Sequence, residues 1–482
     1  MHNMDSAAFS KRKKIIYEHN LKFSQEHSQQ EDQKRYSREE HYRYLRFLVP
    51  EGLRVLDLGC GSGDLLASLK PSYGVGIDFN KIAINRAISK YPSLHFFIED
   101  IEDPRMINDL KGPFDIILMT DIIGELDDIQ ACLAMLHQHF TADTRLIITY
   151  YNPLWGPLVK FAEMIGFKKS QVEQNWLSTA DIRNIVELAD FDVIKQDWRQ
   201  LIPLRILGLG HLFNRYIGTL PLIRKLCLRN YAVARFQEKI QNNEFSTTVL
   251  IPCRNERGNI EDAIKRTPHF CKDIEFIFVE GHSKDGTLEE IYRVRDAYPG
   301  YDIKVLTQPG IGKADAVRAG FSIARGDILM ILDADLTMPP EDLPKYYQAL
   351  VSGKGEFVNG SRLVYPMEKE AMRFLNHIAN RIFSWTFTYL LNQRFSDTLC
   401  GTKVLFRRHY HMIVVNRSYF GDFDPFGDFD LIFGATKLNL KVIEVPIRYS
   451  SRYYGTTQIS RVSHGFLLVK MVIFAFRKLK AF

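Results

Sequence analysis

Residues 325–343, RGDILMILDADLTMPPEDL, contain an apolar run that ends in two aspartates, Asp333 and Asp335. The run ILMIL predicts a buried strand. Because alternate side chains of an extended chain point to the same side, both carboxylates can face one ligand. Two carboxylates with open coordination positions suit Mg²⁺ or Mn²⁺. A solvated loop is the alternative interpretation, and the neighbouring motifs favour the metal.

Three further apolar runs precede this stretch, and helical patterns separate them. Residues 248–251, 274–279 and 303–306, together with 328–332, predict four strands of an α/β domain. Since the carboxyl ends of parallel strands meet at one edge of a sheet, the polar residues beyond them should share a ligand site. The residues at the strand ends are Pro252, Asn255, Glu256 and Glu280. The loop QPGIGKADAVRAG (308–320) adds Lys313, Asp315 and Arg318.

The first half of the chain shows a separate alternation of the same kind. Residues 54–58, 73–77, 94–98, 114–119 and 145–150 predict strands of a parallel, doubly wound sheet. After the first strand, VLDLGCGSGDLL (55–66) places Gly59, Gly61 and Gly63 at a turn where the backbone can approach a ligand closely. Asp64 stands where a dinucleotide fingerprint has its third glycine, which argues against NAD.

Acidic residues at the first three strands add to this glycine turn. Asp57 can orient the turn or meet the amino acid end of a cofactor, Asp78 can accept both hydroxyls of a ribose, and Asp100 can accept an adenine amino group. In this order the motifs resemble the class I S-adenosylmethionine-dependent methyltransferases, over roughly residues 40–200.

That resemblance implies which residues bind S-adenosylmethionine: Gly59, Gly61, Gly63, Asp78 and Asp100. It also implies that Asp121, in FDIILMTDIIGEL (114–126), lines the site. The alternative is that Asp121 and Glu125 cap or solvate a helix. The methyl acceptor stays open, since no catalytic base stands out.

The second half resembles the family 2 inverting glycosyltransferases, and its later segments resemble the dolichol-phosphate mannosyltransferase branch. The similarity runs from about Thr247 to Arg461 and includes GSR (360–362), SDTLCGTKVLFRR (396–408), EVPIRY (444–449) and RYYGTTQISR (452–461). It implies nucleoside contacts for Pro252, Glu256, Glu280 and Asp315, metal binding for Asp333 and Asp335, and phosphate contacts for Arg362 and Arg452. Arg254 and Gly281 depart from the family pattern, so the resemblance does not specify the base or the donor.

The acceptor decides whether the sugar transfer needs a base. A lipid phosphate is already anionic near neutral pH, with a second pKa of about 6 by analogy with phosphorylated side chains. For a hydroxyl acceptor, Asp428 or Asp430 in FGDFDL is the candidate base, and the alternative is that both cap the following helix. A processive polymer synthase and a methyltransferase-like module without turnover remain alternative functions. Val462 replaces the tryptophan of a processive signature, which favours a single transfer.

These patterns predict two α/β domains, a Rossmann-like class I methyltransferase sheet followed by a GT-A-type nucleotide-sugar-binding sheet. The expected parts are a polar arm (1–36), the methyltransferase domain (37–236), a linker (237–246), the glycosyltransferase domain (247–461) and an amphipathic basic C-terminal helix (462–482). In the arm, the cluster of Lys11 to Lys14 is interpreted as a solvated helix face.

Composition limits the partners and the compartment. A net charge of +6, without a basic and aromatic module of a known type, gives no support for nucleic-acid binding. Six dispersed cysteines, no apolar leader and no apolar run of 18 residues predict a reduced, cytoplasmic protein.

Two amphipathic segments predict contact with the inner face of a membrane, as a polyprenyl phosphate or glycolipid acceptor requires. One is the final segment with Arg477, Lys478 and Lys480. The other is a helical stripe of apolar residues, which core burial also explains: Ala371, Phe374, Leu375, Ile378, Ile382, Trp385, Phe387 and Leu390.

Overall fold

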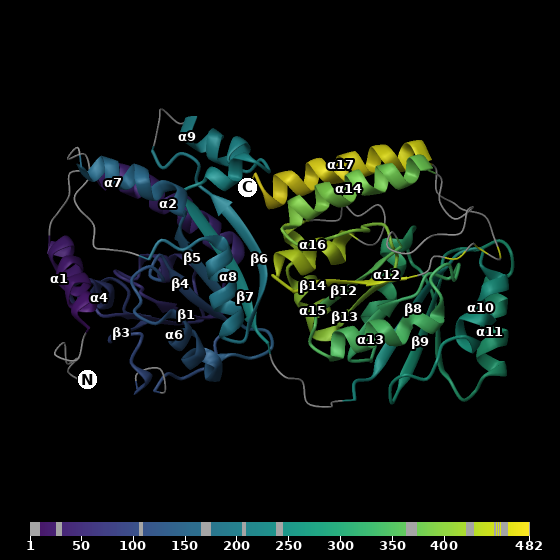
Figure 1. Cartoon of the computed structure of the whole chain (residues 1–482). Coiled ribbons are helices and arrows are strands. Elements are labelled where there is room, and N and C mark those ends of the chain that lie inside the picture. The colour runs from purple at the N-terminus through teal and green to yellow at the C-terminus, as the bar shows by residue number, and fades with distance from the viewer. Residues whose placement is uncertain are drawn as a thin grey trace. The chain divides into compact units, whose positions relative to one another are not determined.

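The computed structural model describes residues 10–25, 31–105, 109–164, 175–204, 209–237, 244–362, 374–420, 429–447, 450, 452, 454 and 461–481. The chain divides into two compact units, Met1–Glu238 and Lys239–Lys480. This division falls inside the segment that the sequence predicts as a linker. Each unit has its own seven-stranded sheet with helices around it (Figure 1).

The first sheet has the strand order β3-β2-β1-β4-β5-β7-β6. Its strands are β1 (Arg54–Leu58), β2 (Tyr73–Asp78), β3 (His95–Ile98), β4 (Ile116–Thr120), β5 (Arg145–Tyr151), β6 (Phe191–Arg199) and β7 (Arg229–Phe236). The five strands β1 to β5 are parallel, whereas β7 runs antiparallel to both β5 and β6. The strand order reverses between β1 and β4, so a ligand crevice is expected beyond their carboxyl ends.

Several helices of the first unit begin where a side chain satisfies free amides of the first turn. Asn80 accepts hydrogen bonds from the amides of Ile82 and Ala83, and Ser178 forms a capping box with Asp181. The helices are α1 (Lys11–Gln25), α2 (Glu31–Leu48), α3 (Asp64–Ser68), α4 (Lys81–Lys90), α6 (Ile129–Met135), α7 (Gly156–Met164), α8 (Thr179–Leu188) and α9 (Leu209–Leu212). Short helical turns are η2 (Leu136–His139), η3 (Pro153–Trp155), η4 (Phe213–Ile217) and η5 (Ile223–Leu226).

The second sheet has the order β10-β9-β8-β11-β13-β12-β14. Its strands are β8 (Thr247–Cys253), β9 (Ile274–Glu280), β10 (Asp302–Thr307), β11 (Ile328–Ile331), β12 (Phe357–Ser361), β13 (Lys403–Phe406) and β14 (Val442–Pro446). The first four are parallel, and β13 runs antiparallel to β11 and β12. The order reverses between β8 and β11, which places the end of β8 beside the Asp-x-Asp motif.

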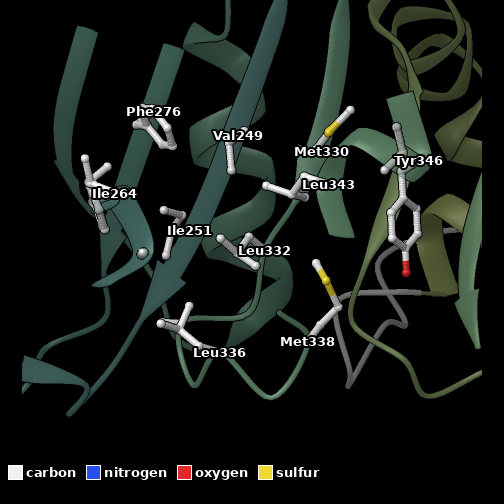
Figure 2. Close-up of a cluster of buried hydrophobic side chains, with 14 of the residues drawn as sticks. Val249, Ile251, Ile264, Phe276, Met330, Leu332, Leu336, Met338, Leu343 and Tyr346 are labelled. Carbon is white, nitrogen blue, oxygen red and sulfur yellow. The ribbon is translucent and has the colours of Figure 1, made fainter. Parts of the chain in front are cut away.

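Helices pack on this sheet and close its core. They are α10 (Ile260–Lys265), α11 (Thr287–Ala297), α12 (Lys313–Ile323), α13 (Leu343–Val351), α14 (Phe374–Leu391), α15 (Arg407–Val415), α16 (Phe429–Lys437) and α17 (Arg461–Leu479), with the short turns η6 (Arg257–Asn259), η7 (Pro340–Asp342) and η8 (Arg417–Tyr419). Figure 2 shows Val249 and Ile251 of β8, Met330 of β11, and Leu343 and Tyr346 of α13 in the buried cluster. Burying one large apolar side chain stabilises a fold by roughly 1.5–3 kcal/mol, so this core fixes the position of the strand ends.

The cysteines and the helices bear on two expectations from composition. All six cysteines are free and buried, in agreement with a reduced protein. Among the described helices, none is long and apolar enough to cross a bilayer. In α14, Ile382 and Trp385 are exposed whereas Phe387 and Leu390 are buried, so this part of the predicted stripe is divided between surface and core. Ala371 of the stripe lies outside the described residues.

Candidate active sites

The glycine turn of the first unit is held by the carboxylate of Asp78. Gly59, Gly61 and Gly63 all adopt positive φ, at 77°, 53° and 71°, a conformation that favours glycine. The amide of Gly61 donates to Asp78 Oδ2 at 2.9 Å, and the amide of Asn80 donates to Oδ1 at 2.7 Å. Burial raises the pKa of Asp78, and these two hydrogen bonds oppose the rise. Asp78 therefore shapes the turn and keeps lone pairs for a ligand.

Asp57 is fully buried at the end of β1, beside this turn. Neither carboxylate oxygen has a hydrogen-bond partner among the described residues. Burial raises the pKa of Asp57 to about 8, and the neighbouring Asp78 adds to the rise. A buried carboxyl group without a partner is costly unless a ligand supplies one. The site therefore suits a ligand with a cationic or hydrogen-bond-donating end.

Helix α1 covers the other side of this pocket. Lys13 Nζ lies 2.5 Å from Asp100 Oδ2 and 2.6 Å from Glu102 Oε2. Burial lowers the pKa of Lys13, but these two carboxylates raise it above its usual value. The cavity between α1 and the strand ends has a volume of about 50 Å³, and its lining includes Asp78 and Asp100.

The expectation of a solvated face is therefore wrong for Arg12 and Lys13, whereas Lys11 and Lys14 are exposed as predicted. Lys13 is only 8% exposed, and Arg12 donates to the backbone oxygens of Gly124 and Leu126 at 2.8 and 2.9 Å. A run of charges predicts solvation only when no partner approaches. Here the carboxylates and carbonyl groups come from loops about 90 to 115 residues further along the chain.

Asp121 lies at the end of β4 in an ion pair. Its Oδ2 lies 2.7 Å from Arg229 Nη2, and its Oδ1 accepts a hydrogen bond from Thr149 at 3.0 Å. Arg229 also donates to the hydroxyl group of Tyr151 at 2.9 Å. Arg229 and Tyr151 were not predicted from sequence spacing, because antiparallel pairing of β7 with β5 brings them together.

In the second unit, both aspartates of the Asp-x-Asp motif contact basic side chains. Lys313 Nζ lies 2.7 Å from Asp333 Oδ1, and Arg452 Nη2 lies 2.5 Å from Asp335 Oδ2. Arg452 Nη1 also lies 3.1 Å from Glu256 Oε1. Five residues from four separate segments of the chain thus meet at one edge of the sheet.

The pKa values of Asp333 and Glu256 are shifted in opposite directions. Burial raises the pKa of Asp333. The positive charges of Lys313, Lys403 and Arg362 lower it by more, so the pKa lies below its usual value. Burial raises the pKa of Glu256 to about 7, although Arg452 opposes the rise.

Two residues that sequence reasoning missed support Asp333. Lys403 is fully buried in β13, and a lysine inside the apolar run KVLF was the one available signal. Gly401 lies against Asp333, and a Cβ atom at this position would overlap the carboxylate. The chain thus keeps both space and positive charge beside this aspartate.

Other predicted donor-site residues shape the loops around this edge. The amide of Ser283 donates to Glu280 at 2.5 Å, the amide of Lys284 donates to Asn255 at 2.8 Å, and the amide of Gly310 donates to Asp315 at 2.7 Å. Pro252 lies in β8, one residue before the strand ends.

Two predicted arginines lie in ion pairs of their own. Arg362 forms a bidentate ion pair with the buried Asp397, with hydrogen bonds of 2.6 and 2.8 Å. Asp430 Oδ2 lies 2.8 Å from Arg417 and 3.5 Å from Arg318. Asp428 lies outside the described residues. The assignment of Arg362 and Arg318 to phosphates, and of Asp428 or Asp430 to the base, stays a prediction.

Comparison with known families assigns each unit. Residues 29–196 match the model "Methyltransferase domain", and residues 248–423 match the model "Glycosyl transferase family 2". The first unit also resembles a possible histamine N-methyltransferase of Thermotoga maritima, with 16% identity, a TM-score of 0.35, and coverage of 46% of this chain and 99% of that one.

Two curated relatives match the chain in part. Over 109 residues it is 35% identical to a dolichol-phosphate mannosyltransferase of Saccharomyces cerevisiae, which covers 21% of this chain and 40% of the relative. Over 219 residues it is 24% identical to an undecaprenyl-phosphate 4-deoxy-4-formamido-L-arabinose transferase of Klebsiella pneumoniae, which covers 44% of this chain and 62% of the relative. The chain therefore spans less than two thirds of either relative.

Proposed function

Because the chain consists of a methyltransferase domain followed by a family 2 glycosyltransferase domain, we propose that it is a bifunctional transferase. The second unit moves a sugar from a nucleotide-sugar donor to a polyprenyl phosphate or a related glycolipid, with inversion at the anomeric carbon. The first unit moves a methyl group from S-adenosylmethionine to an acceptor. One observation supports the proposal most strongly. At one edge of the second sheet, three carboxylates, Asp333, Asp335 and Glu256, form ion pairs with Lys313 and Arg452.

Asp333 and Asp335 fit a divalent cation, either Mg²⁺ or Mn²⁺. Both are carboxylates, the ligands such ions prefer, and Gly401 leaves room beside Asp333. When bound, the ion neutralises charge on the departing diphosphate. Lys313 and Arg452 now compensate the aspartates, and a bound diphosphate offers these cations a second anionic partner. These two side chains would therefore hold the diphosphate in place.

A phosphate acceptor agrees with the contacts of the candidate base. Arg417 and Arg318 both approach Asp430 Oδ2, at 2.8 and 3.5 Å, so this carboxylate oxygen already has two partners. An anionic lipid phosphate needs no such base. The relatives named for dolichol phosphate and undecaprenyl phosphate support this class of acceptor.

Helices α14 and α17 offer a surface for reaching a lipid acceptor. Ile382 and Trp385 of α14, and Phe466 and Ile473 of α17, are exposed. The last turn of α17 carries Arg477 and Lys478. Apolar side chains beside basic ones favour the surface of an anionic bilayer, which supports a peripheral position on the inner face of a membrane.

The first unit has groups that fit S-adenosylmethionine. Asp78 faces the pocket behind the glycine turn and suits ribose hydroxyls, and Asp57 suits the cationic amino acid end. Asp100 is held by Lys13, so an adenine amino group would share or replace that partner. The cofactor supplies an electrophilic methyl group, and the role of these residues is to bind and orient it.

The test uses the full chain with Mn²⁺, labelled UDP- and GDP-sugars, polyprenyl phosphate and labelled S-adenosylmethionine, followed by mass analysis of the products. EDTA and Asp335→Asn should each abolish sugar transfer. Asp296→Asn, at an exposed carboxylate of α11, serves as the matched control and should retain activity. Sugar transfer that survives both EDTA and Asp335→Asn would show that the metal assignment is wrong.

A further inference from the structure

The segment before β7 turns polar side chains inward and apolar ones outward. Asn214 is 5% exposed and donates to the hydroxyl group of Tyr36 at 3.1 Å and to the backbone oxygen of Ile202 at 2.9 Å. By contrast, Leu212 is 51% exposed and Leu222 is 83% exposed. A helix that folds by hydrophobic burial faces the opposite way. Leu212 and Leu222 therefore leave apolar surface exposed on the described part of this side.

A second set of exposed apolar residues follows β5. Leu154 of η3 and Leu158 of α7 are 60% and 59% exposed. The indole nitrogen of Trp155 donates to the backbone oxygen of Leu226, which joins the two segments. We call the combined surface the apolar rim, made of Leu154, Leu158, Leu212, Phe213, Leu222 and Leu226.

The apolar rim lies at the sheet edge that carries the glycine turn. The amide of Asn152, directly after β5, donates to the backbone oxygen of Leu228, and its side chain donates to those of Lys225 and Cys227. Because β7 is antiparallel to β5, its first residue, Arg229, pairs with Tyr151 at the carboxyl end of β5. In Figure 1, α7 and α9 both lie beyond this end of the first sheet. A molecule that covers the rim thus meets the side of the unit where Asp121 and Arg229 lie.

The charge around the apolar rim indicates which kind of partner would bind it. Residues 198–237 contain seven lysines and arginines and no aspartate or glutamate. Of these, Arg199, Arg224, Arg229 and Arg235 pair with aspartates outside the segment, so among the described residues the basic charge beside the rim comes from the exposed Lys225 and the partly exposed Arg215. Apolar and aromatic side chains with basic neighbours are the composition that binds an anionic bilayer surface.

We propose that the apolar rim docks the first unit on an anionic lipid bilayer, and that its methyl acceptor is a lipid-linked molecule held at that surface. This inference rests on the proposed methyl transfer and names its substrate class. In the transfer, the bond between the sulfonium sulfur and the methyl carbon breaks, and its electron pair stays on sulfur. A new bond joins the methyl carbon to an oxygen or nitrogen of the acceptor, whose proton passes to solvent.

The first test locates the bilayer contact with a fluorescent probe. All six native cysteines are buried, so Leu222→Cys can be labelled selectively with an environment-sensitive dye in the full chain. Lys111→Cys, exposed at the opposite end of the sheet, is the matched control. With vesicles containing phosphatidylglycerol, the dye at position 222 should shift to the blue and be quenched by spin-labelled lipid, and the dye at 111 should not.

Two outcomes of this test overturn docking through the rim. One is a chain that sediments with vesicles while the dye at 222 stays in water, because another surface then makes the contact. The other is a blue shift that needs only a higher protein concentration and no vesicles, because a second copy of the chain then covers the rim.

The second test addresses the acceptor. Leu212→Glu combined with Leu222→Glu should weaken vesicle binding by the first unit about tenfold or more, because two exposed leucines no longer enter the bilayer. Label from S-adenosylmethionine should enter the organic phase of a lipid extract, and less of it with the double variant. An unchanged affinity for S-adenosylhomocysteine and an unchanged unfolding temperature exclude misfolding.

The two proposals fail in distinguishable ways. If the label enters only water-soluble products, the lipid-linked acceptor is wrong while methyl transfer stands. If the chain binds no S-adenosylhomocysteine and methylates nothing, the proposed function of the first unit is wrong, whatever the dye at 222 reports.

Discussion

Replacing Asp57 with asparagine should stabilise the first unit at neutral pH and weaken its affinity for S-adenosylmethionine. Asp57 is fully buried and has no hydrogen-bond partner among the described residues, and its pKa is about 8 instead of 3.8. The folded protein therefore holds this proton up to about pH 8, whereas the unfolded chain releases it near pH 4. Since the folded state binds more protons between these values, the free energy of unfolding falls as pH rises.

The size of the effect follows from the shift. One pKa unit corresponds to about 1.4 kcal/mol, so by pH 7 the buried carboxyl group costs up to about 4 kcal/mol. Asparagine carries no ionisable group and removes this dependence. It also removes the carboxyl group that can lose its proton to meet the cationic amino acid end of the cofactor, so the affinity should fall while the stability rises.

The assay is thermal unfolding of the full chain between pH 5 and pH 8, with and without S-adenosylhomocysteine. The transition that the ligand raises reports the first unit. The advantage of Asp57→Asn over the parent chain should grow with pH, by at most about 1.4 kcal/mol for each pH unit. Asp78→Asn is the matched variant and should destabilise the unit, because Asp78 accepts two backbone hydrogen bonds. A difference between parent and Asp57→Asn that stays constant from pH 5 to pH 8 would refute the reasoning.

Three further substitutions test other parts of the structure. Lys13→Ala should speed the entry of S-adenosylhomocysteine in stopped-flow binding. The cavity under α1 is too small for a nucleoside until α1 moves, and the ion pair of Lys13 with Asp100 holds α1 in place. An unchanged entry rate would contradict this. Asp397→Asn should destabilise the second unit by roughly 3–5 kcal/mol in denaturant unfolding, because it leaves Arg362 without its buried partner, whereas Arg293→Ala at an exposed pair should cost under about 1 kcal/mol. Arg452→Ala should raise KM for the donor about tenfold or more in initial-rate assays, because a charged contact is lost; an unchanged KM would remove Arg452 from the donor site.

The parallel strands could be predicted because burial on both faces gives continuous apolar runs. The strands β1, β2, β5, β8 and β9 begin and end within one or two residues of the predicted bounds. Strands β6, β7, β12, β13 and β14 were not predicted. In β6, FDVIKQDWR mixes polar residues into the run, and in β7, RNYAVARF, two arginines and an asparagine interrupt it. Antiparallel pairing of residues far apart in the chain decides both strands.

The residues of the two candidate sites also fall into a group that the sequence predicts and a group that it does not. The glycine turn and Asp333 with Asp335 are local patterns, since a single strand end places them. Arg229, Lys403 and Asp397 lie on or next to later segments that return to those strand ends through long-range pairing. Their side chains become part of a site only through tertiary contacts, which sequence spacing does not encode. Lys13 shows the opposite error, because a charged run that looked solvated is neutralised by distant carboxylates.

The position of β7 limits where the chain can be cut into fragments that fold. β7 is the last strand of the first unit in the sequence, yet it fills an interior position of the sheet, between β5 and β6. A fragment that ends before Arg229 would leave the edge of β5 open and β6 detached, with a row of unpaired amides on each. Such a fragment should aggregate, whereas one that extends past Phe236 should be soluble. During translation, likewise, the ribosome must release the whole of β7 before the methyltransferase sheet can be completed.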